Sequence, residues 1–249
     1  MTAVRLVTIP FSHYCEKARW ALDLSGIAYR EEPHLPLFAW PHAMRAAGKR
    51  TVPALRAEGA RLGESTEVLR WADRERGLGL FEGPTAEVSA LVDALDRGLG
   101  PAARRAVYFE LMKSPRAMRA LFSRGVPAWE RAAGRVVHDA LVGAIRRGLR
   151  IDEAGATRSR STIDATFGDV ERRLADGRAY LFGDRFGAAD LTFAALAAPL
   201  VFPAAYARTC LPWSEVPEPA RQMIEAYRAR PAGRYAMRLY DEHRVSARG

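Results

Sequence analysis

A hydroxyl and a thiol, those of Ser12 and Cys15, lie three positions apart at a point where a strand is expected to meet a helix. The apolar run Val4–Thr8 predicts a short buried strand, and Tyr14–Leu24 has the apolar spacing of a helix. The N-terminus of a helix stabilises a negative charge by about 0.3–1 kcal/mol. Because the thiolate is the nucleophilic form of a thiol, this junction favours an anionic sulfur, either of the protein or of a ligand.

The elements around this junction are expected to alternate between strand and helix in the first eighty residues. Proline cannot donate to a sheet, so Pro53 should precede a strand and not lie within it. Ser65 is predicted to be an N-cap, since its hydroxyl can accept a helix N–H. Further strands are expected at 27–31, 54–56 and 61–62, a short helix at 42–47, and a longer helix from 65 to 76.

Glycine and proline gather between residues 77 and 84, which indicates a domain boundary. We therefore expect a first domain at 1–80 and a second at 85–249. Apolar residues at helical spacing predict that the second domain is all helical. Its helices are expected at 86–99, 104–113, 116–123, 128–150, 162–175, 188–198, 219–229 and 234–242, with a polar break at 152–160.

The composition excludes several classes of protein. The chain has 249 residues and a net charge of +9, and all its basic residues except three lysines are arginine. This arginine excess is typical of a biased base composition, so we expect a solvated surface, with a surface for nucleic acid or an anionic substrate as the alternative. Two distant cysteines suit a reducing cytoplasm. The most apolar run, 191–207, contains two prolines and is too short to span a membrane. No Cys/His cluster has zinc-site spacing.

Four motifs, in this order along the chain, resemble those of the glutathione S-transferase superfamily, in particular its serine/cysteine-type bacterial members. The motifs are Ser12-x-x-Cys15 with the helix after it, 51–55, 63–65 and 183–191. The resemblance covers the whole chain. It implies a thioredoxin-like N-terminal α/β domain followed by an all-α domain, glutathione as co-substrate, a homodimer, and a role in detoxification.

The resemblance gives the residues of the first motif specific roles. Ser12 takes the position of the serine that hydrogen-bonds the glutathione sulfur, and such a donor lowers the pKa of the thiol. Helix capping is the alternative role. Cys15 takes the position of the second cysteine in thioredoxin-type redox motifs, and it would form a mixed disulfide with glutathione if its sulfur is exposed. Otherwise Cys15 packs the helix as a small buried residue. His13 is expected to be an exposed loop residue, with a role in tuning the site as the alternative.

The next two motifs imply contacts with the rest of glutathione. Val52–Pro53 resembles a cis-proline turn, which would direct the Val52 backbone toward the cysteinyl part of the ligand. Glu64 and Ser65 take the positions that bind the α-amino and α-carboxylate groups of the γ-glutamyl part, with helix capping as the alternative. Lys49 is expected either to contact the glycine carboxylate or to be a solvated surface charge.

These motifs predict an enzyme that transfers the glutathione thiolate to a small apolar electrophile. The electrophile is expected between the domains, where Phe38, Trp40 and the segments 102–108 and 122–129 either line a pocket or belong to the core. Asp190 has capping-box spacing after Gly187 and predicts a folding role. Three other functions stay open: a scaffold without catalysis, a reductase or lyase that uses Cys15, and a weak nucleic-acid contact through arginine-rich helices.

Overall fold

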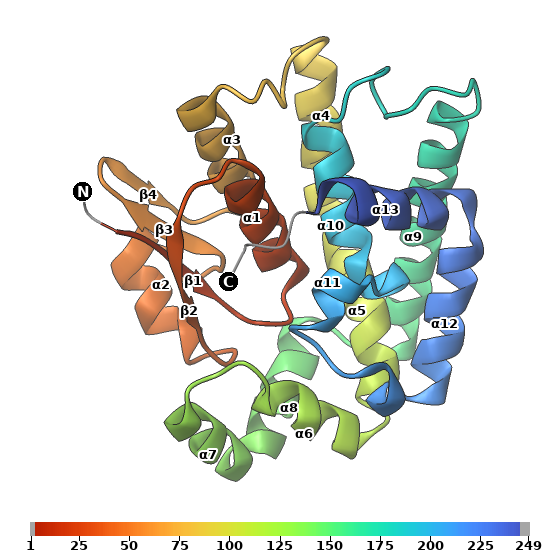
Figure 1. The fold of residues 1–249 in the computed structure, drawn as a ribbon. Helices are drawn as coiled ribbons and strands as arrows, with labels where there is room; N and C mark the ends of the chain where they lie inside the picture. The colour runs from red at the N-terminus through yellow and green to blue at the C-terminus, as the bar shows by residue number, and fades with distance from the viewer. Residues whose placement is uncertain (1–2, 245–249) are drawn as a thin grey trace.

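The N-terminal part of the molecule is built on one four-stranded sheet. The computed structural model describes residues 3–244, and its strands are β1 (Val4–Thr8), β2 (Tyr29–Pro33), β3 (Ala54–Ala57) and β4 (Ala60–Leu62), in the spatial order β2-β1-β3-β4 (Figure 1). β1 is parallel to β2 and antiparallel to β3, and β4 is antiparallel to β3. Leu6 lies between Glu31 and Leu55 in this register. The parallel pair requires a crossover, which the first helix supplies.

Three helices cover the sheet: α1 (His13–Leu24), α2 (Ala39–Ala47) and α3 (Ser65–Arg76). α1 and α3 pack against each other on one face, and α2 lies on the opposite face (Figure 1). Gly48 ends α2 with a φ of 73°, a left-handed conformation that costs glycine little. This arrangement is the predicted thioredoxin-like layer of strands and helices.

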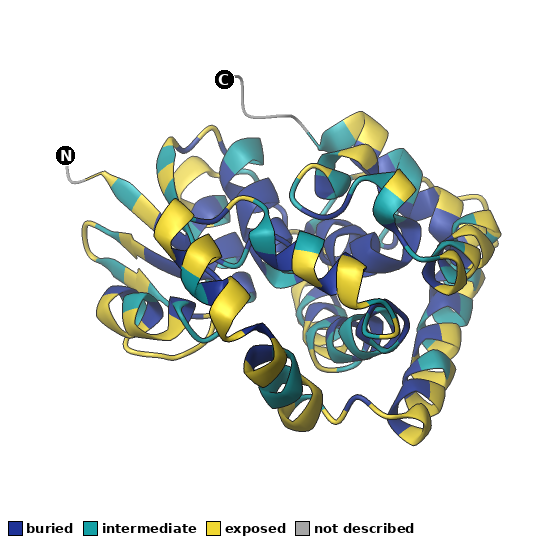
Figure 2. Cartoon of the chain, turned by 90° about the horizontal axis from the view of Figure 1, so that it is seen from below, coloured by how far each residue is buried: buried dark blue, intermediate teal, exposed yellow. Residues whose placement is uncertain are grey.

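The rest of the described chain, after the irregular segment 77–84, is helical. The helices are α4 (Thr85–Arg97), α5 (Leu99–Leu111), α6 (Pro115–Ser123), α7 (Ala128–Val136), α8 (His138–Gly148), α9 (Glu153–Arg173), α10 (Ala188–Val201), α11 (Ala204–Ala207), η1 (Trp213–Glu215), α12 (Glu218–Ala229) and α13 (Pro231–His243). Every residue of α10 is buried, and α10 packs against α1, α4, α5, α12 and α13. Figure 2 shows the dark core inside an exposed outer layer. No helix within 3–244 is long and apolar enough to cross a membrane.

Several predicted boundaries were wrong. The single helix expected at 128–150 is divided into α7 and α8 at Val137. Val136, one of the apolar residues at helical spacing that predicted this helix, is 87% exposed, so that spacing does not correspond to a buried helix face. The expected polar break at 152–160 is the start of α9, because Asp152 caps this helix by accepting a hydrogen bond from Gly155 N at 2.6 Å. β2 begins two residues later than expected, at Tyr29.

α1 is held in place by residues from the helical part of the chain. The Lys17 ammonium contacts both carboxylate oxygens of Asp96 on α4 at 2.9 Å. From the end of the described chain, the His243 carbonyl accepts a hydrogen bond from Trp20 Nε1 at 3.1 Å. Arg244 pairs with Glu16, with 2.7 Å between Nε and Oε1. The helix that begins directly after Ser12 is therefore fixed between the sheet and the helical domain.

Candidate active site

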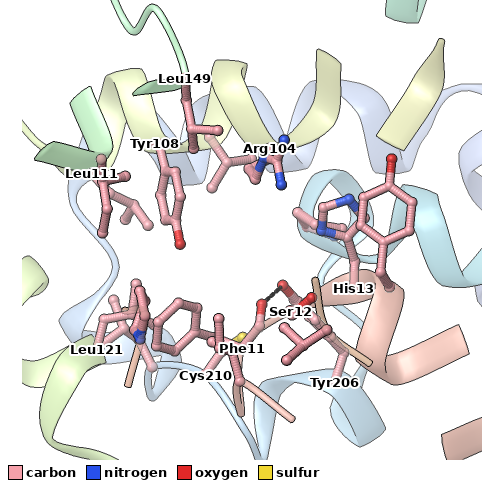
Figure 3. Close-up of a pocket in the computed structure, with 18 of the residues that line it drawn as sticks. Phe11, Ser12, His13, Arg104, Tyr108, Leu111, Leu121, Leu149, Tyr206 and Cys210 are labelled. Carbon is pink, nitrogen blue, oxygen red and sulfur yellow. Dashed lines mark hydrogen bonds between the residues drawn. The ribbon is translucent and has the colours of Figure 1, made fainter. Parts of the chain in front are cut away.

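A cavity of about 460 Å³ lies between the two parts of the molecule, and Ser12 lies in its wall (Figure 3). The turn before α1 and residues 51–52 form one side, while α5, α8 and α12 contribute much of the other. Most of the lining is apolar, as with Leu111, Leu121 and Leu149. Such a lining suits an apolar small molecule with a few polar groups to orient it.

Ser12 is the N-cap of α1, and its backbone is extended with φ −80° and ψ 121°. Its Oγ accepts a hydrogen bond from Cys15 N at 3.4 Å, which satisfies one of the helix N–H groups. This cap uses a lone pair of the hydroxyl, and the hydroxyl also makes a side-chain hydrogen bond with the Cys15 sulfur. The two roles considered for Ser12 are compatible, because the hydroxyl can rotate from Cys15 toward a ligand in the cavity while its oxygen caps the helix.

Cys15 lies behind this wall and does not line the cavity. Its side chain is 0% exposed, and burial raises the pKa of the thiol to about 11. A thiol of this pKa stays protonated at neutral pH and is a poor nucleophile. The mixed disulfide was expected only for an exposed sulfur, and that condition is not met. The structure favours the alternative role of Cys15 as a small buried residue that packs the helix.

The Val52–Pro53 peptide bond is cis, and Val52 lies in the cavity wall together with Thr51. The Thr51 hydroxyl donates to the Gly63 carbonyl at 2.9 Å. This bond joins the proline turn to the loop that precedes α3, so the second and third motifs are adjacent in space.

Lys49, Glu64 and Ser65 lie together at the start of α3, outside the wall of the cavity. The prediction that Ser65 is the N-cap was wrong: Glu64 is the cap residue, and Ser65 is the buried first residue of the helix. The sequence analysis missed Glu67, whose Oε2 accepts from Glu64 N at 3.0 Å. The spacing of three between Glu64 and Glu67, typical of a capping box, was the signal. Lys49 Nζ lies 3.2 Å from Glu67 and 3.6 Å from Glu64, so two carboxylates surround this charge.

Comparison with family models decides the classification. Residues 6–79 match the glutathione S-transferase N-terminal domain, and residues 85–222 match the glutathione S-transferase C-terminal domain. The chain belongs to the glutathione S-transferase superfamily. A comparison with curated proteins gives no significant match.

Solved glutathione transferase structures share the fold of this glutathione S-transferase superfamily member. Poplar glutathione transferase F1 superposes with a TM-score of 0.58 at 16% identity, over 97% of this chain and 99% of that one. A possible glutathione S-transferase from Rhodopseudomonas palustris gives a TM-score of 0.60 at 17% identity, over 98% of both chains. A glutathione transferase family member from Pseudomonas fluorescens gives 0.56 at 16% identity, over 94% of this chain and 92% of that one.

Two polar residues of the cavity in this superfamily member were not assigned to the site by the sequence analysis. His13, expected in an exposed loop, is buried, and its Nε2 donates to the Gly100 carbonyl at 3.0 Å. Burial, with the nearby Arg104 charge, lowers the pKa of His13 to about 3, so the ring is neutral. Arg104 itself comes from α5, within the segment 102–108 that was expected to be either pocket or core. Trp40 also lines the cavity, whereas Phe38 does not.

A separate cluster of His34, His42 and Glu130 has ligand atoms within 4.8 Å of one another. The two imidazole rings are stacked, with centroids 3.7 Å apart and planes 20° apart. Nitrogen lone pairs lie in the ring planes, and because these planes are stacked and nearly parallel, the lone pairs of the two rings do not converge on one point as zinc ligands must. Glu130 Oε2 instead accepts from Leu35 N at 2.8 Å, which fastens α7 to the loop after β2.

Proposed function

We propose that this protein transfers the thiolate of glutathione to a small apolar electrophile, with Ser12 as the hydrogen-bond donor to the sulfur. The observation that carries this proposal is the position of Ser12. Its hydroxyl lies at a helix N-terminus, in the wall of a largely apolar cavity. A donor in a poorly hydrated site favours the thiolate over the thiol.

The same proposal assigns the remaining contacts of glutathione. The Val52 backbone pairs with the cysteinyl part, beside the cis bond to Pro53. Ser65 and the N-terminus of α3 receive the γ-glutamyl carboxylate, and Glu64 receives its amino group. Lys49 faces the glycine carboxylate. Support comes from related structures whose names include ligands, such as a Pseudomonas fluorescens family member with two glutathione bound and the maize enzyme with an atrazine glutathione conjugate.

The reaction follows from this placement. Glutathione loses its thiol proton to solvent, and the Ser12 hydroxyl stabilises the resulting thiolate. The sulfur donates an electron pair to the electrophilic carbon, a carbon–sulfur bond forms, and a leaving group such as chloride departs with its bonding electrons. Removing the Ser12 donor should therefore raise the pKa of bound glutathione and slow the attack.

The Ser12→Ala variant tests the assignment with chlorodinitrobenzene as electrophile. A hydrogen bond to a charged group contributes about 1.5–3 kcal/mol, so kcat/KM should fall about 10- to 100-fold. The pKa of bound glutathione, followed by thiolate absorbance, should rise by about 1 to 2 units. Ser12→Thr is the matched control, because it keeps both the cap and the hydroxyl. Full turnover by Ser12→Ala would refute the catalytic role, and absence of glutathione binding would favour the scaffold function.

Two further properties are part of the proposal. We place the domain boundary in the irregular segment 81–84, so that glutathione binds to residues 1–80 and the electrophile is recognised mainly by residues 85–249. We also propose a cytoplasmic homodimer. Sedimentation equilibrium distinguishes a dimer from a monomer directly.

A further inference from the structure

Arg104 is the only charged side chain among the described residues that line the cavity. It lies on α5, and its guanidinium points into the cavity between Tyr108 and His13 (Figure 3). Because His13 is neutral, nothing else in this wall carries a full charge. An arginine in an otherwise apolar cavity loses hydration that only a hydrogen-bonding or anionic partner can replace.

No group within residues 3–244 supplies such a partner to Arg104. Arg104 is half-buried, and two fully buried cations of the described chain have such partners: Lys17 pairs with Asp96, and Arg19 pairs with Glu31 at 2.8 Å. Arg105, the next residue, donates to the Leu149 carbonyl at 2.9 Å and to Ser159 Oγ at 3.0 Å. Arg104 makes no ion pair and no hydrogen bond with the described residues, although it lines the cavity.

The neighbours of Arg104 on α5 complete a subsite that has a polar part and an apolar part. Tyr108 lies one helical turn further, so both side chains project from the same face, and the Tyr108 hydroxyl points into the cavity without an acceptor among the described residues (Figure 3). Val107 and Leu111 line the cavity from the same helix. The guanidinium fork matches a carboxylate with two parallel hydrogen bonds, and the hydroxyl can add a third.

We infer that the electrophile of this enzyme is an organic anion, an apolar or aromatic body that carries a carboxylate. The carboxylate binds Arg104 and Tyr108, and the apolar body lies against Val107 and Leu111. The identity of the molecule as an electrophile rests on the proposed function, but its binding does not. Glutathione has carboxylates of its own, and these are assigned to Lys49 and Ser65, outside the cavity wall.

Binding of two matched fluorescent probes tests the inference without any reaction. Anilinonaphthalene sulfonate carries an anion on an aromatic body, and phenylnaphthylamine is its uncharged parent. The wild type should bind the anionic probe more tightly. Arg104→Leu should weaken the anionic probe about 10- to 100-fold and change the neutral probe less than about twofold, while Arg104→Lys should give an intermediate value. Arg97→Leu is the control, because its side chain is 80% exposed and the net charge changes equally.

Two results would overturn the inference. One is an equal affinity of wild type and Arg104→Leu for the anionic probe, in variants shown to be folded by circular dichroism. The other is a loss of glutathione affinity in Arg104→Leu as large as the loss of probe affinity. That result would mean that the Arg104 guanidinium binds glutathione and not the electrophile.

A kinetic comparison separates this inference from the proposed function. With chlorodinitrobenzoate, Arg104→Leu should raise KM about 10- to 100-fold, whereas KM for uncharged chlorodinitrobenzene should stay within about twofold. Equal effects on both electrophiles would contradict the anion subsite. If the wild type conjugates neither compound, the transferase proposal fails while the probe experiment still decides the role of Arg104.

Discussion

The buried ion pair between Lys17 and Asp96 offers a test of how the site helix is held. The Lys17 side chain is 0% exposed, and Asp96 is 20% exposed. The Lys17 ammonium also donates a hydrogen bond to the Thr66 hydroxyl on α3, at 2.5 Å. The change Asp96→Asn keeps the shape of the acceptor but removes its charge, so the ammonium remains buried with only neutral partners.

The structure sets the magnitude and the pH dependence of this change. Breaking a buried pair on one side costs about 3–5 kcal/mol, so Asp96→Asn should lose about this much unfolding free energy at neutral pH. Burial already lowers the pKa of Lys17 from 10.5 in the folded wild type, against the attraction of Asp96. Without that attraction the folded pKa falls further. The loss of unfolding free energy is complete at a pH below the pKa of Lys17 in the folded variant. It vanishes as the pH rises through the pKa of Lys17 in the unfolded chain.

Urea unfolding at neutral pH and near pH 10 measures both effects. Asp93→Asn is the matched control, since Asp93 is 53% exposed, lies 3.9 Å from Arg97, and should contribute less than about 1 kcal/mol. The double variant Lys17→Met/Asp96→Leu should recover most of the lost stability, because apolar residues can replace a buried pair. The reasoning is refuted if Asp96→Asn is as stable as Asp93→Asn, or if its penalty is the same at both pH values.

Three further predictions concern buried groups elsewhere. Asp190→Ala should cost about 3–5 kcal/mol in chemical denaturation, because Leu181 N, among other donors, loses its buried acceptor at 2.9 Å; a cost below about 1 kcal/mol would argue against this cap. Glu130→Ala should speed hydrogen exchange of the Leu35 amide, and unchanged protection would contradict that contact. Cys15→Ala should keep kcat/KM within about twofold, since the thiol is buried; a tenfold loss would restore a reactive role.

The sequence predicted the fold class correctly, and it placed Ser12 at a strand-to-helix junction, for local reasons. A strand, a turn and a helix with a hydroxyl at the junction are encoded within twenty residues, and the structure has each of them. The capping of α3 shows the limit of such rules. Ser65 is the commoner type of cap, but Glu67 accepts from the backbone of Glu64, and this bond places the cap one residue earlier.

The sequence predicted a site between the domains, but the polar groups of the cavity could not be assigned because packing brings them together. His13 and Gly100 are 87 residues apart, and their hydrogen bond exists only because α5 lies against the turn before α1. Arg104 has no local pattern that separates it from Arg105, which bonds to residues of the same domain. Arg105 bonds to Leu149 and Ser159, whereas Arg104 has no hydrogen-bond partner among residues 3–244, and this difference is a property of the tertiary structure.

The contacts between α1 and the last described residues also affect the order of folding. Trp20 and His243 are 223 residues apart, and Arg244 and Glu16 are 228 apart. During synthesis, the sheet domain leaves the ribosome before α13 has been synthesised, so α1 cannot form its contacts with the C-terminal residues until later. Long-range contacts of this kind slow folding. A nascent chain stalled before α13 should therefore expose Trp20 and bind chaperones, even though the residues proposed to bind glutathione have already been synthesised.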